Sequence, residues 1–377
     1  MKKILALILC AMLPLGAMAA KKSSASVVTP ASDSRITYVG RTLVSGSDVS
    51  FDWCGTLIRV AFQGDDLSVV LSDTGKDYFN VWIDREPDAE ADFVTAFSGD
   101  TTAVLCTSDF LRARYGKKVP KAHTAVLLKR TEGEQGKVTV HSWTSSAPLL
   151  QAEPVRERVI EFIGDSYTCG FGSENSVATD PFKAETENEN KAFGAIVARY
   201  FGADAYVIAH SGMGVNRNYN DKLRGYTMAD RYLNVFDNGF EKVEGAPLWN
   251  PLSARKPDVT VVNLGANDFS TGRQPQYPLF RNDYIRILKA VKSFYGEDHP
   301  IICISSHVNN YPYIRDAVEA AGLKKVCCYG VGDGTFDPSE RGAAAHPSYE
   351  AHRKLSHVLI PYIATATGWP LTDKEVR

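Results

Sequence analysis

The chain has 377 residues, with 42 Lys or Arg against 44 Asp or Glu, so its formal net charge at pH 7 is −2. This length is sufficient for two domains of ordinary size. The near-neutral balance, without a run of basic residues interleaved with aromatic ones, argues against nucleic acid as a partner. After the first twenty residues, no apolar stretch is long enough to cross a bilayer, so no membrane span is expected.

Residues 1–20 have the pattern of a secretory signal peptide. Two lysines stand near the start, an apolar run extends from Ile4 to Leu15, and Ala17-Met18-Ala19 supplies the small residues of a cleavage site. We therefore expect an exported protein, periplasmic or secreted. After cleavage, Lys21 to Asp33 is expected to be a flexible leader, because it is rich in Ser, Ala and Lys.

Residues 33–150 predict an all-β sandwich, or jelly-roll, domain, because short apolar segments alternate with turn residues. Asp73-Thr74-Gly75 and Glu132-Gly133-Glu134 are expected as two of the turns. The four aromatic residues Trp53, Tyr78, Trp82 and Trp143 alternate with polar neighbours, which favours burial in the core over display as a sugar-binding surface. The expected strands are 51–55, 57–62, 67–71, 78–83, 102–106, 123–128 and 137–141.

Residues 155–372 show strands alternating with helical patterns, which predicts an α/β domain with a parallel sheet covered on both faces. Gln151 to Glu157 is the expected linker. Three long irregular segments interrupt the pattern, and loops this long in a compact domain usually carry function or are disordered. The expected strands are 159–163, 205–209, 257–264, 300–304 and 326–329. The expected helices are 191–201, 282–295, 313–321 and 349–365, and the long segments are 173–190, 216–250 and 269–279.

Two of the long segments differ in composition. Asp180 to Asn190 is polar and acidic, which is typical of a solvated rim. Asn216 to Asn250 holds six aromatic residues, including Trp249, which are expected either to wall a sugar cleft or to hold the loop against the domain. Trp249 is the candidate substrate-binding residue among them.

Three polar residues stand where catalytic groups of an open α/β sheet are found. Ser166 follows the apolar strand 159–163 on a glycine-rich turn, Asn267 follows the strand 257–264, and His346 precedes the last helix. A hydroxyl, an amide donor and an imidazole are parts suited to acyl transfer. Ser166 is then the nucleophile, His346 the base that later protonates the leaving alkoxide, and Asn267 a donor to the oxyanion.

These motifs resemble those of the SGNH (GDSL) hydrolases. Gly164-Asp165-Ser166 matches the nucleophile block, Gly265-Ala266-Asn267-Asp268 the Gly-x-Asn-Asp block, and His346-Pro347 the last block. His210 to Gly214 is similar to the block between them. The resemblance implies an oxyanion hole formed by the backbone N–H groups of Ser166 and Gly212 with the side chain of Asn267. No cofactor and no metal site are expected, since no cluster of ligand residues has metal-site spacing.

Within this group, the chain resembles carbohydrate esterase family 2. The first domain is similar to the N-terminal jelly-roll domain of that family in Val39-Gly40-Arg41, in Phe51-Asp52-Trp53 and in the strand from Tyr78 to Asp84. The resemblance implies an acetylesterase acting on O-acetylated polysaccharides or oligosaccharides of the acetyl-xylan or glucomannan type, with a preference for 6-O-acetyl groups. An acetylated carbohydrate is therefore the expected partner.

The chain departs from the usual pattern near the base. The SGNH triad places an Asp three residues before the histidine, and this position is Ala343. Family 2 uses a Ser-His dyad in such cases, with the imidazole held by a backbone carbonyl. Asp333, Asp337 and Glu340 are the competing candidates for an acidic partner. The aromatic residue that often precedes the family's histidine is replaced here by Ala345.

Two other functions remain alternatives at this stage. A general short-chain lipase or arylesterase would use the same residues with an apolar acyl groove. A non-catalytic carbohydrate-binding protein would retain the scaffold without activity, but the presence of Ser166, Asn267 and His346 argues against it. A thiol nucleophile at Cys169 is disfavoured, because an exported cysteine enzyme would be exposed to oxidation.

Overall fold

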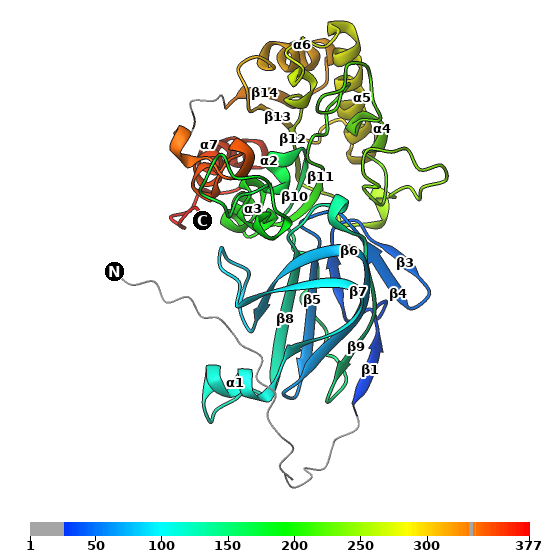
Figure 1. Cartoon of the computed structure of the whole chain (residues 1–377), viewed down its shortest axis with the longest axis vertical. Helices are drawn as coiled ribbons and strands as arrows, with labels where there is room; N and C mark the ends of the chain where they lie inside the picture. Colours follow the sequence, from blue (N-terminus) through cyan, green and yellow to red (C-terminus); the bar gives the residue numbers. More distant parts are fainter. Residues whose placement is uncertain (1–25, 332–334, 336) are drawn as a thin grey trace.

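The computed structural model describes residues 26–331, 335 and 337–377, and it consists of two sheets that follow one another in the chain (Figure 1). The predicted signal peptide lies outside the described residues. The first sheet is entirely antiparallel, with the order β2-β5-β8-β6-β9-β4-β3, while β1 pairs with β9 and β7 with β6. Its strands are β1 (Val27–Pro30), β2 (Thr37–Val39), β3 (Leu43–Ser45), β4 (Asp48–Phe51), β5 (Leu57–Gln63), β6 (Leu67–Ile83), β7 (Phe93–Cys106), β8 (Ala122–Lys129) and β9 (Val138–Ser145), and α1 (Ser108–Tyr115) follows β7.

Three of the four aromatic side chains that the sequence predicts in the core of this domain are buried there. Trp53, Trp82 and Trp143 are fully buried, and Tyr78 is half-buried. Alternate residues of the strands point inward, as in β4, where Val49 is buried and its neighbours are partly exposed. The prediction of a mostly β N-terminal domain is confirmed.

Two expectations for this domain are wrong in detail. The leader expected up to Asp33 includes β1, whose residues pair with β9 from Val27 opposite Ser145 onward. The turn expected at 73–75 lies inside the single long strand β6. There the Asp73 carboxylate accepts the backbone N–H groups of Gly75 and Asp77, each at 2.9 Å, so the chain forms an irregularity in the strand and continues in the same direction.

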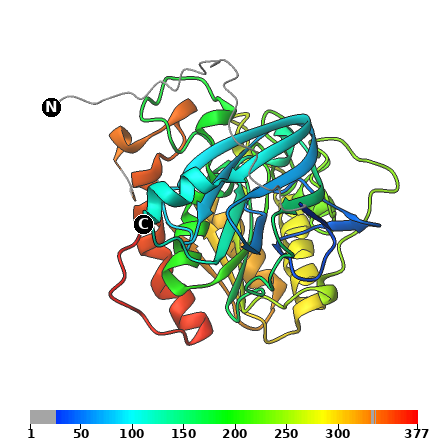
Figure 2. The same ribbon diagram turned by 90° about the horizontal axis from the view of Figure 1, so that it is seen from below.

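The second sheet is parallel, with the order β11-β10-β12-β13-β14. Two layers of helices cover it, as predicted: side chains of α5 and α6 pack on one face and those of α3 and α7 on the other. Figure 2 shows α5 (yellow) and α7 (red) on opposite sides. The strands are β10 (Val159–Gly164), β11 (Asp204–Ala209), β12 (Val259–Asn263), β13 (Ile301–Ser305) and β14 (Val326–Gly330), and the helices are α2 (Ser166–Cys169), α3 (Phe193–Phe201), α4 (Met228–Arg231), α5 (Tyr277–Tyr295), α6 (Tyr311–Ala321) and α7 (Tyr349–Thr367).

The two sheets are joined by a buried polar interface. The Arg59 guanidinium on β5 pairs with the Asp204 carboxylate at the start of β11, at 2.5 and 3.0 Å. The indole N–H of Trp53 donates to the Val235 carbonyl at 2.9 Å. Because these groups satisfy each other away from water, the first domain packs on the second as part of one folded body.

The expectation of a solvated rim at 180–190 is wrong for its last part. Glu187, Asn188, Glu189 and Asn190 are buried, each with no more than 1% of its surface exposed. Asn188 accepts a hydrogen bond from the side chain of Asn80 at 3.0 Å, so its polarity is satisfied within the domain interface. Of the described helices, none combines the length and the apolar character needed to span a membrane.

Candidate active site

Ser166 stands at the carboxyl end of β10, as the first residue of the short helix α2. Gly164 is required before it, because a Cβ at this position would lie 1.9 Å from the Thr168 hydroxyl oxygen. Asp165 caps the helix by accepting the backbone N–H of Tyr167 at 3.2 Å. The turn therefore holds the Ser166 hydroxyl rigidly at the edge of the parallel sheet.

His346 meets Ser166 across 180 residues of sequence. Its Nε2 lies 2.9 Å from the Ser166 hydroxyl oxygen, and its Nδ1 lies 3.1 Å from the backbone carbonyl oxygen of Ala344. A proton on Nδ1 is donated to this carbonyl, which leaves the Nε2 lone pair to accept the proton of the serine. The partner of the imidazole is thus a main-chain carbonyl two residues earlier in the chain.

The acidic competitors lie elsewhere. The Asp337 carboxylate caps a single turn by accepting the N–H of Ser339 at 2.8 Å, and Glu340 pairs with Lys354 at 2.6 Å. Asp333 lies outside the described residues. Ala343 is buried and packs against Gly172, so the position usual for the triad acid is filled by a methyl group.

The backbone that presents the carbonyl adopts an unusual conformation. Ala344 and Ala345 have φ values of 49° and 59°, in the left-handed region that non-glycine residues seldom occupy. Their N–H groups donate to the carbonyls of Asp180 and Ala178 at 2.8 and 2.9 Å. The segment 178–180 therefore holds the residues before His346 in place. Strained backbone of this kind is typical of functional sites.

Aromatic rings surround the imidazole of His346. The ring of Phe171 lies 4.4 Å from it, centroid to centroid, and itself stacks on Phe182 at 4.0 Å, while the ring of Tyr167 lies 5.8 Å away on an edge. Burial in this surrounding lowers the pKa of His346 below its ordinary value, so the ring is neutral near pH 7. Sequence reasoning missed these residues, because nothing in their spacing distinguishes them from core aromatics.

The backbone groups expected to form an oxyanion hole are free of protein acceptors: in the part of the chain that the structure describes, no acceptor pairs with the N–H of Ser166 or of Gly212. Gly212 has a φ of 76°, which suits glycine. The rival N–H, that of Gly214, donates to the Asn218 side chain at 3.1 Å. Geometry thus favours Gly212 over Gly214 as the donor.

Asn267 follows β12, and its side-chain amide donates to the Met213 carbonyl at 2.9 Å, which places it beside the Gly212 segment. Asp268, the next residue, is buried and accepts the three consecutive N–H groups of residues 215–217 at 2.8–2.9 Å. Burial raises the pKa of Asp268 to about 6, although these hydrogen bonds act in the opposite direction. The role of Asp268 is to hold the loop that carries Gly212.

Two exposed aromatic residues of the long segment 216–250 flank Gly212. Tyr219 is 60% exposed and Phe240 is 41% exposed, and both approach within 3.3 Å of the position that a Gly212 Cβ would take. Trp249 is half-buried, and its backbone N–H donates to the Leu233 carbonyl at 2.7 Å. Among the described residues no contact joins Trp249 to Ser166 or His346, so its substrate-binding role stays a prediction.

The other nucleophile and base candidates are engaged in the interior. The Cys169 thiol is fully buried, lies 3.5 Å from a Glu132 carboxylate oxygen, and has its pKa raised well above the ordinary value by burial and by the neighbouring Cys54. His352 is buried on α7, where its Nδ1 accepts the N–H of Phe193 at 3.3 Å. His210 pairs with Asp237 at 2.5 Å. None of these side chains contacts Ser166 in the described structure.

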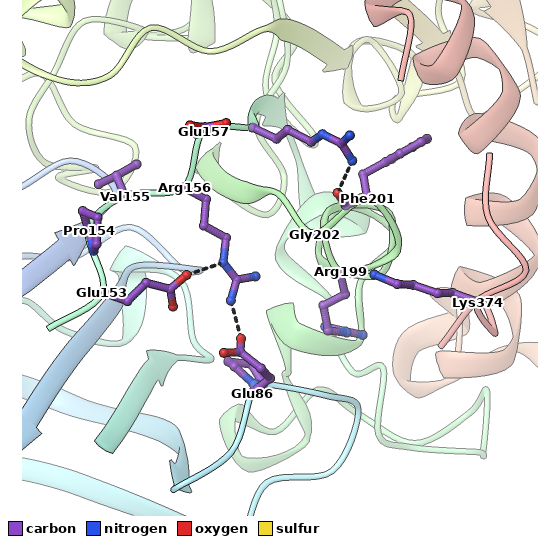
Figure 3. A pocket seen from close by; sticks show the side chains of 12 residues that line it. Glu86, Glu153, Pro154, Val155, Arg156, Glu157, Arg199, Phe201, Gly202 and Lys374 are labelled. Carbon is purple, nitrogen blue, oxygen red and sulfur yellow. Dashed lines mark hydrogen bonds and ion pairs between the residues drawn. The ribbon is translucent and has the colours of Figure 1, made fainter. Parts of the chain in front are cut away.

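A cavity at the junction of the two domains is separate from this site. It measures about 730 Å³ and lies between the domains, with its lining drawn in Figure 3. Its central Arg156 pairs with Glu86 and Glu153, and Arg158 donates to the Phe201 carbonyl. A smaller pocket of about 200 Å³ adjoins Asn267 and is lined by Ala266, Phe269, Ser270, His307, Asn309 and Asn310.

One buried group has ligand atoms close enough to hold a metal ion. Atoms of Glu132, Cys169 and Glu187 lie within 4.8 Å of one another. These residues come from three distant parts of the chain, so sequence spacing did not indicate them. Glu132 already accepts hydrogen bonds from Ser211 and Cys169, and Glu187 accepts the N–H of Glu132. We assign no metal to the group, and the expected absence of a metal stays a prediction.

Comparison with known families places both domains. The model described as carbohydrate esterase 2 N-terminal matches residues 38–152, and the GDSL-like lipase/acylhydrolase family matches residues 162–371. The chain is 30% identical to the cellulase/esterase CelE of Acetivibrio thermocellus over 333 residues. The aligned region covers 84% of this chain and 38% of CelE. It therefore spans little more than a third of the length of that relative.

Other relatives match along nearly their whole length. An acetylxylan esterase/glucomannan deacetylase of Cellvibrio japonicus is 26% identical over 349 residues, which cover 87% of this chain and 90% of that protein. A family two carbohydrate esterase from Clostridium thermocellum, solved in complex with cellohexaose, superposes with a TM-score of 0.76 at 28% identity, over 89% of this chain and all of the other. The chain thus belongs to the GDSL-like lipase/acylhydrolase family and carries the N-terminal domain of the family 2 carbohydrate esterases, which are carboxylic ester hydrolases.

Proposed function

We propose that the chain is an exported acetylesterase that removes acetyl groups from O-acetylated plant-type polysaccharides or their oligosaccharides. The observation that carries the proposal is the continuous chain of contacts from the Ser166 hydroxyl through His346 to the Ala344 carbonyl. The names of the relatives, an acetylxylan esterase/glucomannan deacetylase among them, support the substrate class.

The reaction follows from the roles of these groups. Neutral His346 accepts the proton of Ser166 while the hydroxyl oxygen attacks the acetyl carbonyl. The oxyanion that forms is stabilised by the N–H groups of Ser166 and Gly212 and by the Asn267 amide. Protonated His346 then gives its proton to the leaving sugar alkoxide. Water attacks the acetyl-serine in the second half of the cycle, with His346 again as the base.

The surface around the nucleophile supports a carbohydrate as the leaving group. Ala345 stands where an aromatic residue is expected before the histidine, but the ring of the exposed Phe240 and the Cβ of the exposed Tyr219 lie beside Gly212. Such rings, with one apolar face and polar surroundings, stack on sugar rings. The pocket next to Asn267 has polar groups from Ser270, His307 and Asn310, which suits hydroxyl groups better than a long acyl chain.

The test is acetate release from acetylated glucomannan and xylan, together with hydrolysis of 4-nitrophenyl esters of graded chain length. We expect activity on acetate and little on octanoate, and none in Ser166→Ala, with a serine-directed phosphonate labelling the wild type at Ser166. Comparable rates on long-chain esters would favour a general lipase or arylesterase. Sugar binding without any hydrolysis would favour a non-catalytic carbohydrate-binding protein.

A further inference from the structure

The loop that carries Gly212 is held from the other domain. Glu132 belongs to a turn of the N-terminal domain between β8 and β9, yet its carboxylate accepts the backbone N–H of Ser211 at 2.5 Å. Glu132 is 1% exposed and Ser211 is half-buried, so the carboxylate reaches this N–H from the interior. It joins the β domain directly to the residue before Gly212, the proposed oxyanion donor.

Glu132 is itself held firmly. Its backbone N–H donates to Glu187 at 3.2 Å, and its carbonyl accepts the ammonium group of Lys129 at 3.1 Å. Gly133, the next residue, packs so closely on Asp237 that a Cβ would lie 2.6 Å from the Asp237 Cβ. The backbone of Glu132 is therefore held in place, and its carboxylate contacts Ser211 from a fixed position.

The contacts of the Gly212 segment show what the hydrogen bond controls. After Gly212, two hydrogen bonds fix the chain. The Tyr219 N–H donates to the Gly212 carbonyl at 2.7 Å, and the Met213 N–H donates to the His210 carbonyl at 3.1 Å. Before it, the contact that fixes the Ser211 N–H is the Glu132 carboxylate. The direction of the Gly212 N–H depends on both neighbouring peptide planes, because glycine itself imposes little conformational restraint.

We propose that Glu132 is a positioning residue, by which the N-terminal domain orients the Gly212 N–H toward the oxyanion. The inference rests on the proposed esterase function. It assigns to the β domain a part in the reaction rate, in addition to any part in sugar binding. A donor displaced by a fraction of an ångström loses much of its effect on the transition state while substrate binding is preserved.

Three substitutions of Glu132 separate the effect of its side-chain length from the effect of its charge. Glu132→Gln keeps an acceptor oxygen at the same distance, Glu132→Asp keeps the charge but is one methylene too short, and Glu132→Ala removes the acceptor. We expect kcat on 4-nitrophenyl acetate to fall on the order of 10- to 100-fold in the Asp and Ala variants, with KM changed by less than about threefold. The Gln variant should retain most of the activity. Glu134→Gln, on the exposed side of the same turn, is the matched control.

A second measurement reports on the oxyanion hole itself. Methylboronic acid forms a tetrahedral adduct with a reactive serine, so its inhibition constant should rise in the Asp and Ala variants in proportion to the loss of kcat/KM. The inference is overturned if the Asp variant is as active as the Gln variant, or if the losses appear in KM alone. If Glu132→Ala does not fold, the Asp and Gln pair decides. Wild-type activity dependent on Ser166 is measured in parallel, so failure of the esterase function is recognised separately.

Discussion

His346, the proposed base, lies in a surrounding that keeps its imidazole uncharged. Burial against Phe171 and Tyr167 lowers the pKa of His346 below 6.5, and only the neutral ring accepts the serine proton. Activity is therefore present above this pKa and lost as the pH falls through it. We expect the acid limb of kcat/KM on 4-nitrophenyl acetate to have its midpoint below 6.5. Phe171→Ala, which opens the ring to water, should move the midpoint upward, whereas a wild-type midpoint at 7 or above would contradict the assignment.

The amide of Asn267 is expected to act on the transition state and not on the substrate. Loss of one such donor in a serine hydrolase costs about 10²–10³ in kcat. Asn267→Ala should show a loss of this size with little change in KM, since the ground-state carbonyl needs the donor less. Steady-state kinetics on 4-nitrophenyl acetate measure both constants. An effect confined to KM would identify Asn267 as a substrate-binding residue.

A main-chain carbonyl as the partner of the base leads to a further expectation at the residue scale. Asp337→Asn and Glu340→Gln should keep near-wild-type kcat, because Asp337 caps its own turn and Glu340 pairs with Lys354. Asp333→Asn is measured alongside them to complete the set of acidic candidates. A loss of a hundredfold or more in any one variant, which is the order expected for a misplaced tautomer, would replace the carbonyl by that carboxylate.

At the scale of elements, the sequence predicted most of what depends on local pattern. The parallel strands and the helices α3, α5, α6 and α7 were recognisable because apolar runs and 3.6-residue periods are local properties. The motif residues Ser166 and His346 were recognisable from resemblance. Three features were missed because each depends on a partner distant in sequence. Strand β1 depends on β9, the continuity of β6 on a turn near Gln135, and the burial of Glu187 on the turn at Glu132.

The loop before His346 has a conformation that glycine would adopt more easily than alanine. Ala345 has a φ of 59° and an exposed side chain, so its methyl group gains no packing to offset the left-handed backbone. Ala345→Gly should raise the free energy of unfolding by up to about 1 kcal/mol, less the entropy cost of glycine in the unfolded chain. Chemical denaturation measures the change. The control Ala321→Gly, at the end of α6, should lower stability instead, and a destabilised Ala345→Gly would show that the loop is not strained.

At the scale of the whole molecule, the interface makes the two domains one unit. The two domains contact each other through buried groups in the pairs Arg41 and Glu161 and Trp53 and Val235, and through buried Glu132 and half-buried Ser211. A binding module joined by a linker would have an exposed and mostly wet junction. Here the parallel sheet carries the proposed catalytic residues, and turns of the antiparallel domain contact the loops behind them.

The buried ion pair of Arg59 and Asp204 tests whether the two domains also unfold together. Both side chains are about 5% exposed or less. Among the described residues, removal of Arg59 leaves the buried Asp204 carboxylate with only the backbone N–H of Arg156 at 2.9 Å and the Arg156 guanidinium at 3.9 Å, and the loss of such a buried partner costs up to about 3–5 kcal/mol. Arg59→Ala should therefore lower the free energy of unfolding by this amount, while calorimetry still shows one cooperative transition for the whole chain. Arg112→Ala removes an exposed pair with Asp109 on α1 and should cost less than about 1 kcal/mol. Two separate transitions in the wild type, or an Arg59→Ala variant that destabilises only the first of them, would show instead that the domains fold independently.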